Sequence, residues 1–256
     1  MSNPTAKKTA LNAWLARKKK ASTPSSIPKM PKDAPAVLSR GQQRLWLLQQ
    51  LYPDNAFYQY AHTYRFIGQL NVDNLLASFQ LVAQRHEVLR TNFVEENNQV
   101  IQKIRPNAEI PTEIIDLQHF TIEKQAQEIE KITLKRVRKT FDLTQDALLR
   151  ITVLIVADDE HLVLLSMHHI IGDRWSLQIL NQEVAATYQE LQTKENTAIS
   201  LLKVQYADYA HWQQTQPEKP EDLAYWKQQL AGELPILSLP TDAAKPTRPT
   251  FQGVST

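Results

Sequence analysis

The chain has 256 residues, of which 42% are hydrophobic and 22% charged, and its formal net charge is +2. It can therefore bury a sizeable core. The absence of cysteine excludes disulfides, thiol nucleophiles and zinc–thiolate sites. The five glycines form neither a GxGxxG fingerprint nor a phosphate-binding loop, which argues against nucleotide sites of those kinds. No apolar stretch approaches about 18 residues, so we expect no membrane span and a cytoplasmic protein.

The N-terminus is a basic arm. Eight of the 29 Lys and Arg residues lie in residues 1–32, ahead of the first acidic residue. Leu11, Trp14 and Leu15 share one helical face, and the Ser- and Pro-rich residues 21–35 resemble an extended linker. The arm is therefore either a solvated helix or a docking helix for another protein. Its short apolar face and single tryptophan argue against membrane or nucleic-acid binding.

Beyond the arm, strand-like and helix-like patterns alternate. In chain order, we expect a helix over 41–51, a strand over 58–67, a helix over 72–87, a hairpin of 91–93 with 99–104, a helix over 122–140, strands over 147–156 and 160–167, and helices over 175–194, 206–215 and 221–231. This pattern predicts an α+β fold, an α/β sandwich with helices packed on a mixed sheet.

Two consecutive histidines end the last predicted strand. Because side chains alternate along a strand, His169 shares a face with Val163, Leu165 and Met167, whereas His168 points to the other face. The two rings then cannot converge on one metal ion, so we expect no metal site here. Histidine is the usual residue for moving protons near neutral pH. We therefore expect one histidine to act in a functional site and the other to have a structural role.

The order HHxxxD followed by Trp175-Ser176 resembles the signature of nonribosomal peptide synthetase condensation domains, within the chloramphenicol-acetyltransferase-like acyltransferases. Further segments match that family in the same order: residues 38–47 (S-x-x-Q-x-R-L-W), 85–93 (R-H-E-x-L-R-T-x-F), 141–150, 206–213 (Y-x-D-Y-A-x-W-Q), and 239–242 with 248–249. Epimerisation relatives carry a similar double histidine and remain an alternative.

The resemblance implies roles for single residues. His169 would lie in the substrate tunnel beside the attacking amine, either as a general base or as the group that orients the amine. His168 would serve packing and hydrogen bonding. Asp173 would be structural, in a buried pair with Arg90. The candidates for the substrate channel are Gly172, Arg174, Trp175 and Ser176.

Two features depart from the family pattern. Arg174 replaces the usual glycine, so it either adopts a positive φ at a cost of about 1 kcal/mol or more, or shows that this position needs no positive φ. Its side chain can also reach toward the channel. In addition, the family continues into a second lobe, whose motifs are not found in these 256 residues. We therefore divide the chain into residues 1–35 (arm and linker), 36–242 (first lobe) and 243–256 (start of the connection to a C-terminal lobe).

The implied activity is amide or peptide bond formation between a donor acyl or peptidyl thioester and the amine of an acceptor aminoacyl thioester, in nonribosomal peptide biosynthesis. No cofactor is bound directly, because both substrates arrive on the phosphopantetheine arms of carrier domains. The expected partners are those carrier domains, the C-terminal lobe, and an upstream synthetase through the basic arm. The alternative is a non-catalytic half-domain that docks or awaits its partner lobe, and we expect the isolated chain to be inactive.

Overall fold

The computed structural model describes residues 27–56, 58–107, 109–193, 201–217, 219–237 and 240. Most of the basic arm and all of the predicted connection therefore lie outside the described residues. The described elements are α2 (Arg40–Leu51), β1 (Gln59–Ile67), α3 (Val72–Arg85), the 3-10 helix η1 (Glu87–Arg90), β2 (Thr91–Glu96), β3 (Gln99–Ile104), β4 (Thr112–Asp116), α4 (Ile122–Arg138), β5 (Leu149–Ala157), β6 (Glu160–His168), α5 (Arg174–Thr193), α6 (Tyr206–Thr215) and α7 (Pro220–Gln229).

A four-stranded mixed sheet with the order β1-β6-β5-β4 forms the centre of the fold. β6 is antiparallel to both of its neighbours, whereas β4 and β5 are parallel. At the end of β6, His168 lies opposite Gln59 of β1. The chain therefore leaves the middle of the sheet at the two histidines.

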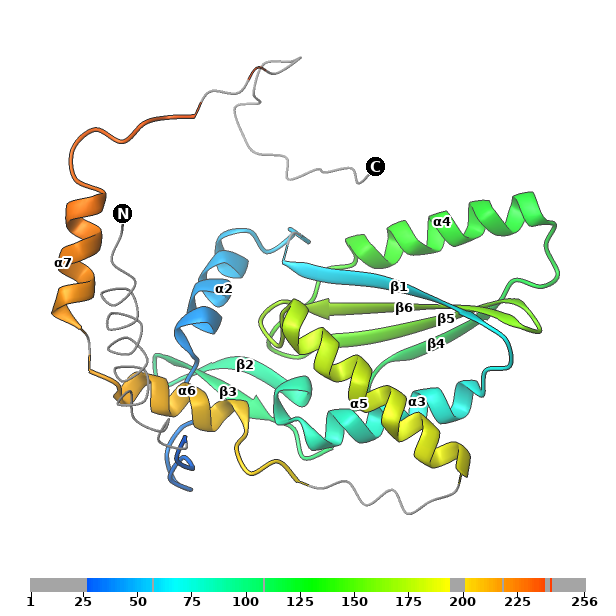
Figure 1. Cartoon of the computed structure of the whole chain (residues 1–256), viewed down its shortest axis with the longest axis horizontal. Helices are drawn as coiled ribbons and strands as arrows, with labels where there is room; N and C mark the ends of the chain where they lie inside the picture. The colour runs from blue at the N-terminus through cyan, green and yellow to red at the C-terminus, as the bar shows by residue number, and fades with distance from the viewer. Residues whose placement is uncertain are drawn as a thin grey trace, which may run out of the picture.

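Helices cover both faces of this sheet, α3 and α5 on one face and α4 on the other (Figure 1). Val163, Leu165 and Met167 of β6 belong to the core beneath α3 and α5. Leu162 and Leu164 belong to the core beneath α4. This alternation agrees with the predicted division of the strand, and the α/β sandwich is confirmed.

β2 and β3 form a separate two-stranded sheet. They are joined at Asn97 and Asn98, which have φ of 53° and 62°. Two consecutive residues with positive φ are typical of a tight hairpin turn, and asparagine tolerates that conformation better than most residues. None of the helices in the described ranges is both long and apolar enough to cross a membrane.

Candidate active site

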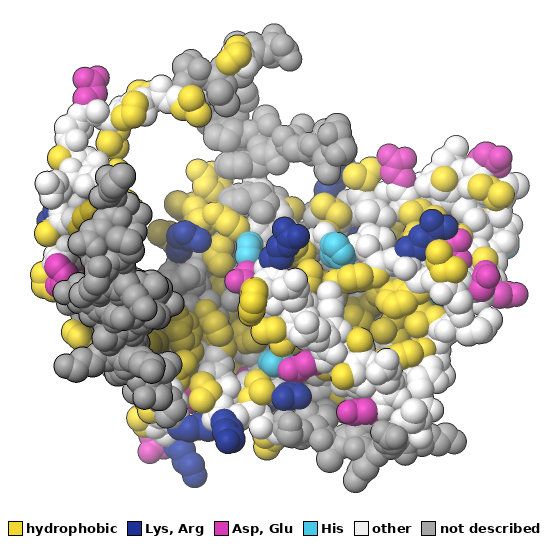
Figure 2. All heavy atoms as spheres, in the orientation of Figure 1, with side chains coloured by type: hydrophobic (Ala, Val, Ile, Leu, Met, Phe, Trp, Pro, Cys, Tyr) yellow, Lys and Arg dark blue, Asp and Glu magenta, His cyan; other side chains and the backbone are white. Residues whose placement is uncertain are grey.

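A cavity of about 550 Å³ opens where β6 ends. Its walls come from α2, the junction of α3 and η1, the loop after β6, the start of α5, and residues 202–209. Figure 2 shows this face with a recess floored by hydrophobic side chains and with histidine and Lys or Arg side chains near its edge. Much of the lining is apolar, including Leu45, Val88, Leu89, Met167 and Leu180. Such a cavity suits the apolar part of a small-molecule substrate.

His169 lines this cavity. Its backbone N–H donates to the carbonyl oxygen of Tyr58 at 2.8 Å, which ties the residue to the start of β1. Its ring atom Nδ1 lies 2.8 Å from the carbonyl oxygen of Gly172. A carbonyl can only accept, so Nδ1 carries the proton and Nε2 of the neutral ring carries the lone pair. His169 therefore offers one basic nitrogen of fixed tautomer.

His168 lies in the core instead, with 1% of its surface exposed. Its Nδ1 accepts from the backbone N–H of Ile170 at 3.1 Å, and its Nε2 lies 3.4 Å from Oε1 of Gln49. Burial, and to a lesser extent the neighbouring His169, lower the pKa of His168 from 6.5 to about 4. His168 is therefore a neutral core residue at physiological pH, and only the second histidine of the pair lines the cavity.

Gly172 lies at a close approach of side chains. A Cβ atom built on it would lie 3.1 Å from Cβ of Ser176 and 3.3 Å from Cε of Met167. Its φ does not lie in the left-handed region. The absence of a side chain thus lets the loop after β6 pass closely over the first turn of α5 and brings its carbonyl within reach of His169.

The predicted ion pair between Asp173 and Arg90 is not formed. Oδ1 of Asp173 accepts from the backbone N–H and the hydroxyl of Ser176, at 2.8 and 2.7 Å, and these bonds lower the pKa of this exposed carboxyl. The side chain of Arg90 instead donates to the carbonyl of Arg105 and lies 3.8 Å from Glu87. The physical reason is that an aspartate just before a helix has backbone donors within reach, and Asp173 caps α5.

Arg174 and Trp175 do not line the cavity, contrary to their prediction as channel residues, whereas Gly172 and Ser176 do. Arg174 is the exposed first residue of α5, and Trp175 is 72% exposed. Arg174 does not have a positive φ. An arginine in place of the family's glycine therefore costs no backbone strain here, because a helical first residue tolerates any side chain.

Sequence reasoning assigned no site role to Gln42, which braces the loop after β6. Its side chain accepts from the backbone N–H of Ser39 at 3.0 Å and donates to the carbonyl of Ile170 at 3.4 Å. The Ser39 hydroxyl in turn lies 3.0 Å from the hydroxyl of Tyr206, which also lines the cavity. These residues belong to the matched segments 38–47 and 206–213. The motifs therefore contained them but did not indicate that they support the loop after β6.

His86 also lines the cavity. Its Nε2 lies 2.6 Å from Oε2 of Glu183. The two residues are 97 positions apart in the sequence, and no motif joins them. Within the described part of the chain, no group of three or more His, Cys, Asp or Glu residues is placed to hold a metal ion.

A helix-covered mixed sheet with a histidine-lined cavity at the end of its central strand places the protein among α/β-sandwich proteins with a candidate active site. The family model described as "Condensation domain" matches residues 33–256. The chain belongs to this condensation-domain family.

Relatives and solved structures agree with this assignment. The chain is 34% identical to a linear gramicidin synthase protein of Brevibacillus parabrevis, over 90% of this chain and 3% of that protein. It is 35% identical to surfactin synthase subunit 1 of Bacillus subtilis (strain 168), over 90% of this chain and 6% of that protein. The complex of the X-domain and OxyB from teicoplanin biosynthesis matches with a TM-score of 0.73 at 26% identity, over 86% of this chain and 49% of that one. The chain thus spans about half of this solved relative and a small part of the synthases.

Proposed function

We propose that this chain forms one wall of the active site of a condensation domain in nonribosomal peptide biosynthesis. The reaction joins a donor acyl or peptidyl thioester to the amine of an acceptor aminoacyl thioester, with both substrates carried on phosphopantetheine arms of carrier domains. The observation that supports this proposal most is His169, which lines an apolar cavity with its Nε2 lone pair unused by described residues.

The amine nitrogen attacks the thioester carbonyl carbon, the carbon–sulfur bond breaks, and the amine loses a proton. Nε2 of His169 can accept that proton and pass it to the departing thiolate, or accept a hydrogen bond that orients the amine. The bond from Nδ1 to the Gly172 carbonyl holds the ring in place in either role.

Because the chain spans about half the length of the solved relatives, we propose that the remaining half of the domain supplies the opposite wall. Without that wall, His169 faces water and the two thioesters are not held together, so preorganisation is lost. We therefore expect the 256-residue chain alone to form no amide.

The test is a single-turnover assay of the complete domain with loaded donor and acceptor carrier domains. His169→Ala should lower the rate of amide formation by about 100-fold or more while leaving circular dichroism and thermal unfolding unchanged. His119→Ala, an exposed histidine that follows β4, is the matched control and should keep its activity. A folded His169→Ala protein with near-normal turnover would contradict the proposal.

A docking role is the second candidate, because a solved relative with a TM-score of 0.73 is an X-domain in complex with OxyB. α7 presents exposed Leu223, Tyr225 and Trp226, a surface suited to another protein. The basic arm is a further candidate contact, for an upstream synthetase. A complete domain that binds a partner protein but forms no amide from any thioester pair would favour this role.

A further inference from the structure

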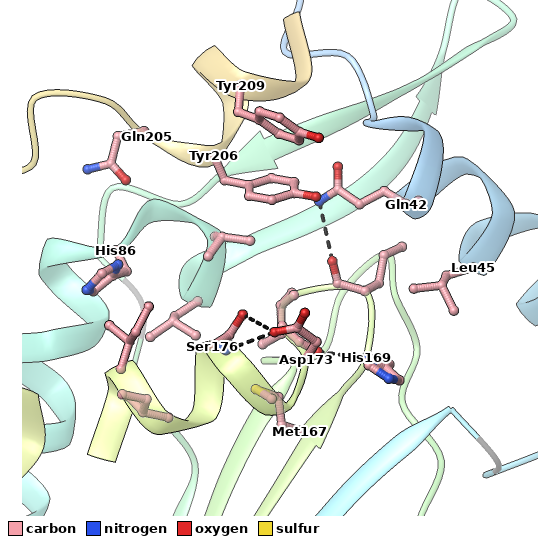
Figure 3. A pocket seen from close by; sticks show the side chains of 18 of the residues that line it. Gln42, Leu45, His86, Met167, His169, Asp173, Ser176, Gln205, Tyr206 and Tyr209 are labelled. Carbon is pink, nitrogen blue, oxygen red and sulfur yellow. Dashed lines mark hydrogen bonds between the residues drawn. The ribbon is translucent and has the colours of Figure 1, made fainter. Parts of the chain in front are cut away.

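A second histidine faces the same cavity from its other side. His86 and His169 lie at opposite sides of the cavity in Figure 3, and both line it. His86 follows the last residue of α3, and Glu183, its partner, belongs to α5. The two helices that pack against each other on one face of the sheet are therefore joined by this polar pair, of which His86 lines the cavity.

The contact with Glu183 fixes the orientation of the His86 ring. Nε2 of His86 lies 2.6 Å from Oε2 of Glu183, and a carboxylate oxygen only accepts, so Nε2 carries a proton. Nε of Arg85 lies 3.8 Å from the same oxygen, so Glu183 also forms an ion pair with the residue before His86. Nδ1 of His86 makes no hydrogen bond to any of the described residues, and 20% of the side chain is exposed. A neutral His86 therefore presents an acceptor at the cavity.

The backbone around His86 does not need this side chain. The amide group of Gln205 accepts from the backbone N–H of Glu87 at 3.1 Å and donates to the carbonyl oxygen of Arg85 at 2.9 Å. The polar groups on both sides of the turn are thus satisfied by one side chain that follows much later in the sequence. The His86 ring is left to hold Glu183 and to face the cavity.

Apolar side chains predominate at this end of the cavity: Val88, Leu89, Ile179, Leu180, Leu202 and Val204. Gln205 also lines this end, but its amide is engaged by the backbone on both sides of His86. A chain of CH₂ groups is stabilised against such walls because its burial removes apolar surface from water. An acceptor that is desolvated without a donor costs free energy. A ligand that fills the cavity and stops short of a hydrogen bond to Nδ1 is therefore disfavoured relative to one that supplies a donor.

We propose that His86, positioned by Glu183, determines specificity by accepting a hydrogen bond from the end of a substrate chain. The substrate class is an apolar acyl tail or amino-acid side chain that ends in a hydroxyl or amide N–H group. This inference rests on the proposed function, since the chain belongs to one of the two thioester substrates. Donor tail and acceptor side chain share this chemistry, and the experiment separates them.

The test uses the complete domain and pairs of thioesters that differ only by a terminal hydroxyl, in a series of increasing chain length. The series is varied first on the donor and then on the acceptor, and kcat and KM are measured for each. At the matching length, we expect the hydroxylated member of a pair to be preferred by about five-fold or more in kcat/KM, on one of the two substrates only. That substrate is the one whose chain enters the cavity.

Variants distinguish recognition from a purely structural role. His86→Phe keeps an aromatic ring but removes the acceptor, so the ratio of kcat/KM between the two members of a pair should fall to near one. Glu183→Gln retains an acceptor for Nε2 and should keep the preference, whereas Glu183→Ala should weaken it. His119→Phe is the same substitution at an exposed residue outside the cavity and should change nothing.

The inference is overturned if folded His86→Phe protein prefers the hydroxylated thioester as strongly as the unaltered domain does. It is also overturned if the unaltered domain gives a kcat/KM ratio near one at every chain length, on the donor and on the acceptor. If His86→Phe does not fold, the two Glu183 variants replace it. A preference that is equal in Glu183→Ala and Glu183→Gln then overturns the inference. Absence of any product defeats the proposed function instead. In that case, calorimetry measures the affinity of the same variants for the paired acyl-pantetheine thioesters and decides whether His86 recognises the hydroxyl group.

Discussion

His169 donates a hydrogen bond from Nδ1 to the carbonyl oxygen of Gly172, three residues further along the chain, at 2.8 Å. The loop after β6 therefore fixes the tautomer of the histidine that it carries. The bond depends on a backbone position that passes close to the side chains of Met167 and Ser176. The orientation of the His169 ring therefore depends on the tight packing of the loop at Gly172.

Gly172→Ala tests this coupling. The added Cβ would lie 3.1 Å from Cβ of Ser176, so its neighbours must give by a few tenths of an ångström. Because Ser176 is held in the first turn of α5, we expect a loss of about 1–3 kcal/mol in the free energy of unfolding with reduced amide formation. Gly41→Ala is the matched control, because its Cβ would meet nothing closer than 3.8 Å on a helix that favours alanine. Denaturant unfolding measures both variants. Equal stabilities for the two would contradict the close approach seen at Gly172.

The low pKa of His168 predicts a pH-dependent stability. The unfolded chain binds a proton at His168 near pH 6.5, whereas the folded chain does so only near pH 4. The contribution is therefore complete above about pH 6.5 and is lost as the pH falls toward 4, by roughly 3 kcal/mol. His168→Asn keeps an acceptor for the N–H of Ile170 but cannot titrate. The free energy of unfolding, measured with urea from pH 4 to 7, should change less with pH in this variant than in the unaltered protein. An equal change with pH in the two proteins would refute a buried neutral His168.

Asp173 and Arg90 are expected to act independently. Asp173→Ala removes the cap of α5 and should cost about 1 kcal/mol, whereas Asp173→Asn should retain most of that stability. A double-mutant cycle with Arg90→Met should give a coupling free energy near zero, within about 0.5 kcal/mol. Chemical denaturation of the four proteins supplies the cycle. A coupling of about 3 kcal/mol or more would instead indicate the buried ion pair that the family resemblance implies.

Arg174→Gly asks whether the departure from the family pattern affects turnover. Arg174 is exposed, begins α5 and lies outside the cavity lining, so we expect a rate of amide formation within about two-fold of the unaltered domain. Stability should fall by up to about 1 kcal/mol, because glycine is a poor helix former. Single-turnover kinetics and thermal unfolding measure the two effects. A gain in rate would show that the arginine obstructs the channel.

Local patterns predicted most of the fold well. The boundaries of α6 were predicted without error, and the alternation of β6 placed Met167 and His169 on one face. β4 was missed because it is a short edge strand with only Ile114 and Ile115 as its apolar pair. Its position is set by parallel register with β5, where Ile114 lies opposite Val153, and this is a tertiary constraint.

The site was predicted less completely for a similar reason. The strand pattern separated His168 from His169, but it carried no information on which acceptor or donor each side chain meets. Asp173 was assigned a distant partner, although the nearby donors of Ser176 satisfy its carboxylate. The contact of His86 with Glu183 joins two segments through helix packing, and no sequence motif encodes such a contact.

The central position of β6 has a consequence for how the protein is made. β1 pairs with β6, from Gln59 opposite His168 to Ile67 opposite Glu160, so its partner leaves the ribosome roughly a hundred residues after it. Until then β1 lacks the strand that pairs with it among the described residues, and the cavity lacks both the loop after β6 and α5. Closing so long a segment is slow. During synthesis, β1 is therefore exposed to pairing with other chains until β6 has been made.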